Sequence, residues 1–352
     1  MKRRFVLLAL PLLASVLSAC SPAGQAKAEA ASGSSAAAPA NVTLLNVSYD
    51  LSRSFYEHLN PEFIRFYEQQ HPGSKLVIQQ SHGGASKQAL AVANGLRADV
   101  VTLNQESDLA MLADKKLISA NWQAEFPNQA VPYHSIMVLL VRKDNPKNIR
   151  DWSDLSRNDI DIIIANPKTS GTARYGFLAM YDAALQDGGG DEALAEQTLR
   201  RFVSRIKVMD SGARGASNSF VQRKIGDVMV TTENEAALTA QTFGSDGYQV
   251  VYPSSSVAID NPVAIVRSVT EAKGTTAIAH DYLNFLWSDV AQTRAAEEYL
   301  RPSNPDILAK YSSRFPKVNT WRVTDKLGSW ADVTQKYFAD GGLLDRVSVP
   351  AH

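Results

Sequence analysis

The sequence predicts an α/β protein built of two lobes. Short apolar stretches alternate with stretches of helical spacing: residues 43–47, 75–79 and 99–103 are predicted strands, and residues 55–70 and 86–96 are predicted helices. Strands that alternate with helices form a parallel sheet with helical crossovers. About 310 residues follow the N-terminal segment, which is too long for one simple core and enough for two α/β lobes.

The N-terminal residues have the features of an export signal. Residues 2–4 are basic, and an apolar run over residues 5–16 follows. This run is too short for a resident transmembrane helix but fits the apolar part of a signal peptide. The segment ends in L-S-A-C at residues 17–20, which resembles a bacterial lipobox. We expect a signal peptide over residues 1–19 and a lipid on Cys20, with an ordinary signal peptide and a chance cysteine as the alternative.

Composition excludes several other classes of protein. Residues 20–40 are almost entirely small and polar, which predicts a flexible tether after the lipidated cysteine. The chain has one cysteine, so neither a disulfide framework nor a C-x-x-C metal site is expected. Three of the 36 basic residues lie within residues 1–19, so the mature chain has 33 basic and 36 acidic residues, a net charge of −3. That charge balance lacks the excess of basic residues that is typical of nucleic-acid-binding proteins.

Three predicted strand ends carry loops of the same kind. Q-S-H-G-G-A-S-K-Q (80–88), N-P-K-T-S-G-T-A-R-Y (166–175) and D-S-G-A-R-G-A-S-N-S-F (210–220) each follow a strand and open a helix. Ligands of parallel sheets bind beyond the carboxyl ends of the strands, and a helix N-terminus presents unpaired N–H groups to an anion. One such loop is more often only a turn with an N-cap, but three in one chain favour a shared anion site.

An acyl-serine hydrolase is the enzymatic alternative. K-T-S-G at residues 168–171 resembles the K-T-G element of serine β-lactamases, and S-R-I-K at residues 204–207 matches S-x-x-K. Their order along the chain is the reverse of that family's, and no S-D-N stands between them, so we expect no enzyme. No loop matches a nucleotide motif, and the six histidines lack H-x-x-H or H-E-x-x-H spacing, so neither a cofactor nor a metal is expected.

Several motifs together resemble the periplasmic sulfate/thiosulfate-binding proteins of ABC importers. They run from about Leu44 to Asp345 in the family's order: L-L-N-V-S-Y-D (44–50), Q-S-H-G-G-A-S-K-Q (80–88), A-D-V-V-T (98–102), N-P-K-T-S-G-T-A-R-Y (166–175), D-S-G-A-R-G (210–215), G-D-V (226–228) with E-N-E (233–235), and D-K-L-G-S-W (325–330). The stretch from Asn104 to Pro127 looks closer to the thiosulfate-type members, and D-S-G-A-R-G looks closer to the sulfate-type.

The resemblance implies the two-lobed, type II periplasmic-binding-protein fold. Each lobe is then a mostly parallel sheet flanked by helices, and two crossover strands at residues 135–141 and 262–266 join the lobes. Lobe 1 comprises residues 41–134 and 262–352, and lobe 2 comprises residues 135–261. The ligand is clamped between the lobes by hinge closure.

The resemblance also implies a binding site. This family holds its dianion mainly by backbone N–H groups, one serine hydroxyl and one tryptophan indole. Carried over by motif, the backbone donors are those of Ala85, Gly171, Thr172 and Ala213, and the hydroxyl is that of Ser170. Sulfate-type members carry the indole directly before E-N-E, where this chain has Thr232, so the sixth donor is changed or missing.

The function implied is that of an extracytoplasmic solute-binding protein, which delivers sulfate or thiosulfate to the permease of an ABC importer. Another oxyanion, such as molybdate, is the alternative ligand. We expect a periplasmic monomer anchored to the membrane by the lipid on Cys20. Arg174 and Arg214 are expected to brace the loops, and the helix N-termini to supply the field that holds the anion.

Overall fold

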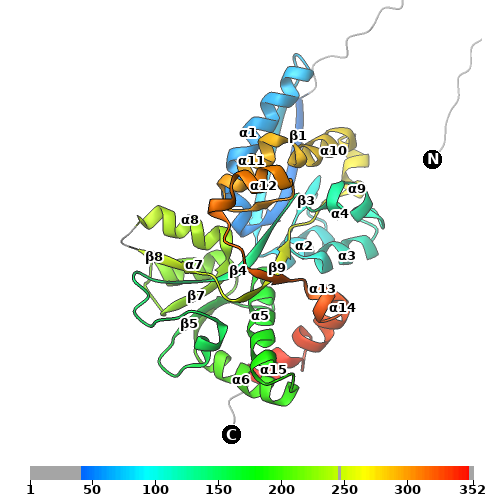
Figure 1. Ribbon diagram of the computed structural model, residues 1–352. Coiled ribbons are helices and arrows are strands. Elements are labelled where there is room, and N and C mark those ends of the chain that lie inside the picture. The colour runs from blue at the N-terminus through cyan, green and yellow to red at the C-terminus, as the bar shows by residue number, and fades with distance from the viewer. Residues whose placement is uncertain (1–40, 245–246, 349–352) are drawn as a thin grey trace, which may run out of the picture. The chain divides into compact units, whose positions relative to one another are not determined.

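The structure, a computed structural model, describes residues 41–244 and 247–348 (Figure 1). The predicted signal peptide (1–19) and the tether (20–40) with its lipidated Cys20 lie outside the described residues. The described chain forms two sheets, each with a hydrophobic core of its own, which confirms the predicted two-lobed α/β architecture. Among the described helices, none combines the length and apolar character needed to cross a membrane.

The first lobe is built on a four-stranded sheet in the order β10-β3-β1-β2. β1 (Asn41–Tyr49) is parallel to β2 (Lys75–Gly83) and β3 (Val100–Thr102), whereas β10 (Val263–Ile265) is antiparallel to β3. The helices of this lobe are α1 (Arg53–Gln70), α2 (Ala85–Ala93), α3 (Glu106–Asp114), α4 (Pro127–Ala130), α9 (Arg267–Lys273), α10 (Thr276–Asn284), α11 (Asp289–Glu297) and α12 (Pro305–Lys310).

Two features of this lobe follow directly from residue spacing and pairing. Phe55, Leu59 and Phe63 recur every four residues along α1, so they share one face, and that face is buried in the core. β2 extends to Gly83, beyond the predicted strand end at residue 79, because its ladder with β1 continues to the pair of Tyr49 with Gly83. The turn between β2 and α2 is therefore reduced to a single residue.

The second lobe contains a larger sheet, in the order β12-β9-β4-β7-β5-β6, with β8 and β11 also paired to β4. Its strands are β4 (Tyr133–Arg142), β5 (Ile162–Ala165), β6 (Ile206–Asp210), β7 (Val228–Thr232), β8 (Tyr248–Val251), β9 (Ser255–Asp260), β11 (Arg301–Pro302) and β12 (Asn319–Trp321). Its helices include α5 (Gly171–Asp187), α6 (Glu192–Ser204), α7 (Ala213–Val221) and α8 (Glu233–Phe243). The run I-I-I-A of β5 is wholly buried, as expected of a parallel strand covered on both faces.

Short 3₁₀ turns complete the two lobes. They lie at Asp50–Ser52, Trp122–Ala124, Trp152–Ser156, Phe285–Trp287 and Ser312–Arg314.

Strands β4 and β9 connect the lobes (Figure 1). β4 pairs with β9 at residues 134–136, and further along it pairs with β7 and β8 of the second sheet. β9 leads into β10, which belongs to the first sheet. The predicted crossover stretches fall on β4 and around β10. A pair of strands shared by two lobes is a hinge about which the lobes can close.

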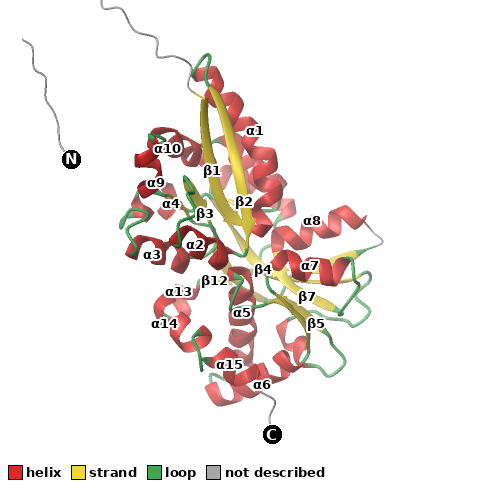
Figure 2. Cartoon of the chain, turned by 180° about the vertical axis from the view of Figure 1, so that it is seen from behind, coloured by secondary structure: helices red, strands yellow, loops and turns green. Residues whose placement is uncertain are grey.

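The C-terminal part of the chain packs on the second lobe, which differs from the prediction. After β12 come α13 (Val323–Lys326), α14 (Trp330–Val333), a π-helical turn (Thr334–Phe338) and α15 (Leu343–Ser348), beside α5 and α6 (Figure 2). Their apolar side chains join the second core: the rings of Trp330 and Tyr175, and those of Tyr337 and Tyr181, meet edge-to-face. The assignment of all of residues 262–352 to lobe 1 is therefore corrected for residues 319–348.

Candidate functional site

Four helices of the two lobes begin just beyond the carboxyl ends of strands. α2 follows β2 in the first lobe, whereas α5, α7 and α8 follow β5, β6 and β7 in the second. Their N-cap residues are Gly84, Ser170, Gly212 and Thr232. The first N–H groups of each helix lack partners within the helix and carry the positive end of its dipole, so each start can hold negative charge.

The predicted ligand-binding residues lie at these helix starts, and all of them are buried. Ala85 is the first residue of α2, Gly171 and Thr172 open α5, and Ala213 opens α7. The two N-caps among them, Ser170 and Thr232, precede α5 and α8. Sequence spacing along one strand–helix unit can predict such positions, but only the fold can show whether they meet.

The starts of α2 and α5 meet at the junction between the two lobes (the cleft). A Cβ added to Gly84 would lie 2.7 Å from the carbonyl oxygen of Thr169, so the two backbones approach as closely as glycine permits. Next to them, Asn104 Nδ2 of the first lobe donates to Thr172 Oγ1 of the second over 2.9 Å. The fold therefore brings Ala85 to the same cleft as Ser170, Gly171 and Thr172.

The start of α7 joins the same cleft. The Thr169 hydroxyl donates to the carbonyl oxygen of Ser211 (2.8 Å), which ties the loop before α5 to the loop before α7. From the first lobe, Asp50 Oδ2 accepts the N–H of Arg214 at 3.1 Å. Burial raises the pKa of Asp50, and the Arg214 N–H partly opposes this shift by stabilising the carboxylate. The positive end of the α7 dipole attracts this carboxylate in the same way as it would attract a bound anion.

Ser170 keeps a hydrogen available for a ligand. Its Oγ accepts a long hydrogen bond from the N–H of Ala173 (3.4 Å), as an N-cap oxygen does. A hydroxyl that accepts through its oxygen still carries its own proton. Ser170 can therefore cap α5 and donate to an anion at the same time.

Thr232 is engaged locally. Its hydroxyl donates to Asn234 Oδ1 at 2.6 Å, and Asn234 Nδ2 donates in turn to the carbonyl oxygen of Leu51 in the first lobe. The Thr232 proton is thus directed to a neighbour two residues along the chain.

The motifs that suggested an acyl-serine enzyme make separate structural contacts. Lys168 Nζ donates to the carbonyl oxygen of Phe338 (2.8 Å) and pairs with Asp345 (3.0 Å), so it ties the loop before α5 to the C-terminal segment. This ammonium group lowers the pKa of Asp345. Ser204 donates to the carbonyl oxygen of Arg201 at the exposed end of α6.

Sequence reasoning missed Asn104 and Gln105. Both follow β3, and Gln105 Oε1 accepts from Arg174 Nη1 over 3.2 Å, across the cleft. Arg174 also donates from Nε to the carbonyl oxygen of Pro167 (3.0 Å), which is the bracing role expected of it. The rule that ligands lie beyond strand ends, applied to the strand predicted at residues 99–103, would have indicated these two residues.

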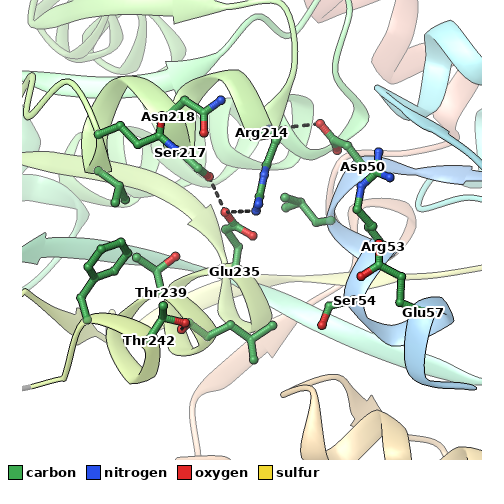
Figure 3. Close-up of a pocket in the computed structure, with 15 residues that line it drawn as sticks. Asp50, Arg53, Ser54, Glu57, Arg214, Ser217, Asn218, Glu235, Thr239 and Thr242 are labelled. Carbon is green, nitrogen blue, oxygen red and sulfur yellow. Dashed lines mark hydrogen bonds and ion pairs between the residues drawn. The ribbon is translucent and has the colours of Figure 1, made fainter.

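A groove of about 420 Å³ adjoins the cleft beside the start of α7 (Figure 3). Arg53 and Glu57 of α1 line one side, and the other side is formed by α7 and α8. In Figure 3, Arg214 lies between Asp50 and Glu235, whose carboxylate is 3.6 Å from the guanidinium. Burial raises the pKa of Glu235, while a hydrogen bond from Ser217 and the nearby Arg214 counteract this shift.

Within residues 41–244 and 247–348, no group of three His, Cys, Asp or Glu side chains is placed to hold a metal ion. His82, in the first glycine-rich motif, bonds through Nδ1 to Ser48 Oγ at 2.6 Å, and burial lowers its pKa.

Known proteins resemble this chain along most of its length. The family model for bacterial extracellular solute-binding proteins matches residues 53–300. The thiosulfate-binding protein of Pseudomonas aeruginosa is 46% identical over 315 residues, covering 89% of this chain and 94% of that protein. The sulfate-binding protein of Escherichia coli K12 is 42% identical over 308 residues, covering 88% and 93%.

Among solved structures, the sulfate-binding protein SubI from Mycobacterium tuberculosis H37Rv superposes with a TM-score of 0.76 at 30% identity, covering 85% of this chain and 100% of that one. This likeness confirms the predicted type II two-lobed fold.

Proposed function

We propose that this chain, which belongs to the bacterial extracellular solute-binding proteins, captures sulfate or thiosulfate between its lobes for an ABC importer. The observation that supports the proposal is that the loops before α2, α5 and α7 contact one another where the two lobes meet. These starts offer N–H donors from both lobes, so a ligand bound to all of them also holds the lobes together.

The predicted donors are sufficient for a releasable ligand. A hydrogen bond to a charged group contributes about 1.5–3 kcal/mol, so five of them contribute about 7–15 kcal/mol before the costs of association. A micromolar dissociation constant corresponds to about −8 kcal/mol and is within that range. No side-chain cation needs to touch the anion, because Arg174 and Arg214 have other partners and the helix starts supply positive potential.

Calorimetric titration of the ligand-free protein with sulfate, thiosulfate and molybdate tests the proposal. We expect sulfate and thiosulfate to bind with micromolar or tighter affinity, and molybdate to bind more weakly. Absence of binding by both sulfur oxyanions would overturn the proposal. A β-lactam probe tests the enzymatic alternative, and we expect no labelling of Ser204.

The proposed location is the periplasm, with the chain anchored by a lipid on Cys20. The support is the L-S-A-C motif that follows a short apolar run. Cys20→Ser should leave the chain without lipid and shift it from the detergent phase to the aqueous phase on partition. A variant that partitions as the parent does would remove the anchor from the proposal.

A further inference from the structure

Gln105 lies between the two helix starts that meet at the cleft. It is fully buried at the end of β3, and its Oε1 accepts from Ser86 Oγ of α2 (3.3 Å) and from Arg174 Nη1 of α5 (3.2 Å). A Cβ added to Gly171 would lie 3.0 and 3.1 Å from Gln105 Cγ and Cδ. The amide is therefore packed against the first residue of α5, whose N–H is a predicted ligand donor.

The orientation of this amide follows from the chemistry of its neighbour. A guanidinium carries donors only, so the amide atom that faces Arg174 has to be the oxygen, and the nitrogen points elsewhere. That nitrogen, Nε2, is buried and has no hydrogen-bond partner in the part of the chain that the structure describes. Asn104 differs, because its neighbour Thr172 carries a hydroxyl that accepts or donates equally well.

A buried donor without a partner is rare in folded proteins, since its lost hydration is not replaced. This unpartnered N–H group belongs to a side chain packed against the first residue of α5, where the two lobes meet.

We propose that Gln105 is a ligand-binding residue whose Nε2–H donates to the oxyanion held between α2 and α5. It supplies this donor from the first lobe. This inference rests on the proposed function, and it gives the site a side-chain amide in addition to the serine hydroxyl and the backbone donors.

Two substitutions of Gln105 distinguish a hydrogen bond donated to the anion from a role in packing alone. Gln105→Glu keeps the shape and the oxygen facing Arg174, but it removes the N–H and places a carboxylate against the anion. Gln105→Met removes the donor without adding charge. We expect Gln105→Met to weaken binding of sulfate and thiosulfate about 10- to 100-fold, and Gln105→Glu to weaken it further.

Gln292 offers a matched control. It is fully buried in the first lobe, and its Nε2 donates to the carbonyl oxygens of Pro132 (2.8 Å) and Leu286 (2.7 Å). Gln292→Met should lower the Tm of the ligand-free protein and leave the affinity for both anions at the parent value.

The relative anion affinities of Gln105→Met and Gln105→Glu show whether Gln105 donates to the ligand. If Gln105 only packs and accepts from Arg174, Gln105→Glu binds the anions better than Gln105→Met does, and the proposal is overturned. It is equally overturned if the parent binds and both variants bind with the parent affinity. A parent that binds neither anion contradicts the proposed function instead, so the two failures are distinguishable. Should Gln105→Met fail to fold, Gln105→Leu takes its place, because it also removes the donor without adding charge.

Discussion

The two loops that meet across the cleft are held in place by different means. In the first lobe, the turn before α2 is a glycine N-cap without a side-chain cap, and it approaches the opposite lobe because Gly84 has no Cβ. In the second lobe, side chains hold the loop before α5: Lys168 reaches the C-terminal segment and Arg174 the carbonyl oxygen of Pro167.

Each loop is therefore sensitive to a different kind of substitution. The turn before α2 can approach the second lobe because Gly84 has no side chain. A methyl group added there would hinder closure of the lobes without removing a hydrogen bond. The second-lobe loop depends on hydrogen bonds from elements far away in the sequence, so it is disturbed by substitutions that never touch the ligand. Donors on a rigid, supported loop lose less entropy when they bind.

The largest effect in this comparison is expected for Ser170→Ala. It removes a hydroxyl donor from the supported loop, and we expect binding to weaken by about 1.5–3 kcal/mol, measured by calorimetry. Ser288 is a matched control, because it caps α11 in the same way, accepting from the N–H of Ala291 (3.2 Å). Ser288→Ala should lower stability only, and unchanged affinity in Ser170→Ala would remove Ser170 from the site.

Gly84→Ala tests the first-lobe turn. Its new methyl group would meet the Thr169 carbonyl oxygen, so the closed cleft has to relax, at a cost of about 1–2 kcal/mol in binding free energy. The Tm of the ligand-free protein should stay near the parent value, because opening of the lobes relieves the contact.

Gly83→Ala is the neighbouring control for this turn. A Cβ there lies 3.4 Å from the Gln88 side chain, an ordinary contact, so the affinity should change by less than about 0.5 kcal/mol. Equal affinities for the two alanine variants would show that close approach at Gly84 is not needed for binding.

Lys168→Met tests the support of the second-lobe loop from the C-terminal segment. Loss of its bonds to Phe338 and Asp345 should weaken anion binding by about 1 kcal/mol, since the donors on the loop become less ordered. Lys336 lies in the same segment but pairs with Glu192 on α6 (2.9 Å), away from the loop. If Lys336→Met weakens binding as much as Lys168→Met does, the contribution of Lys168 is not specific to the loop.

The smallest effect is expected at the start of α8. Thr232→Val keeps the side-chain shape and removes the hydrogen bond to Asn234, so the affinity should change by less than about 0.5 kcal/mol. The Tm should fall, because the buried Asn234 Oδ1 then loses the hydrogen bond from Thr232. A tenfold loss of affinity in titration would instead place the Thr232 hydroxyl against the ligand.

Much of the fold and part of the site could be predicted from local pattern. Alternation of strand and helix spacing indicated the α/β class, and the glycine- and serine-rich motifs marked where α2, α5 and α7 begin. These features depend on neighbours within one strand–helix unit, so they are encoded over a few residues. Gln105 has no such mark, because its importance depends on Ser86 and Arg174, which lie on different lobes.

Which faces are apolar, and which loops end in helix starts, can be read from local residue spacing. What those faces pack against depends on the folded chain. The aromatic residues between Trp330 and Phe338 are apolar in either lobe, and their packing on α5 places them in the second core rather than the first. The same packing gives Lys168 its partners, and only the folded chain shows that Gln105 Nε2 has none among the described residues. Apolar contact is non-directional, so spacing specifies that a face is buried, whereas its partner depends on how the whole chain fills space.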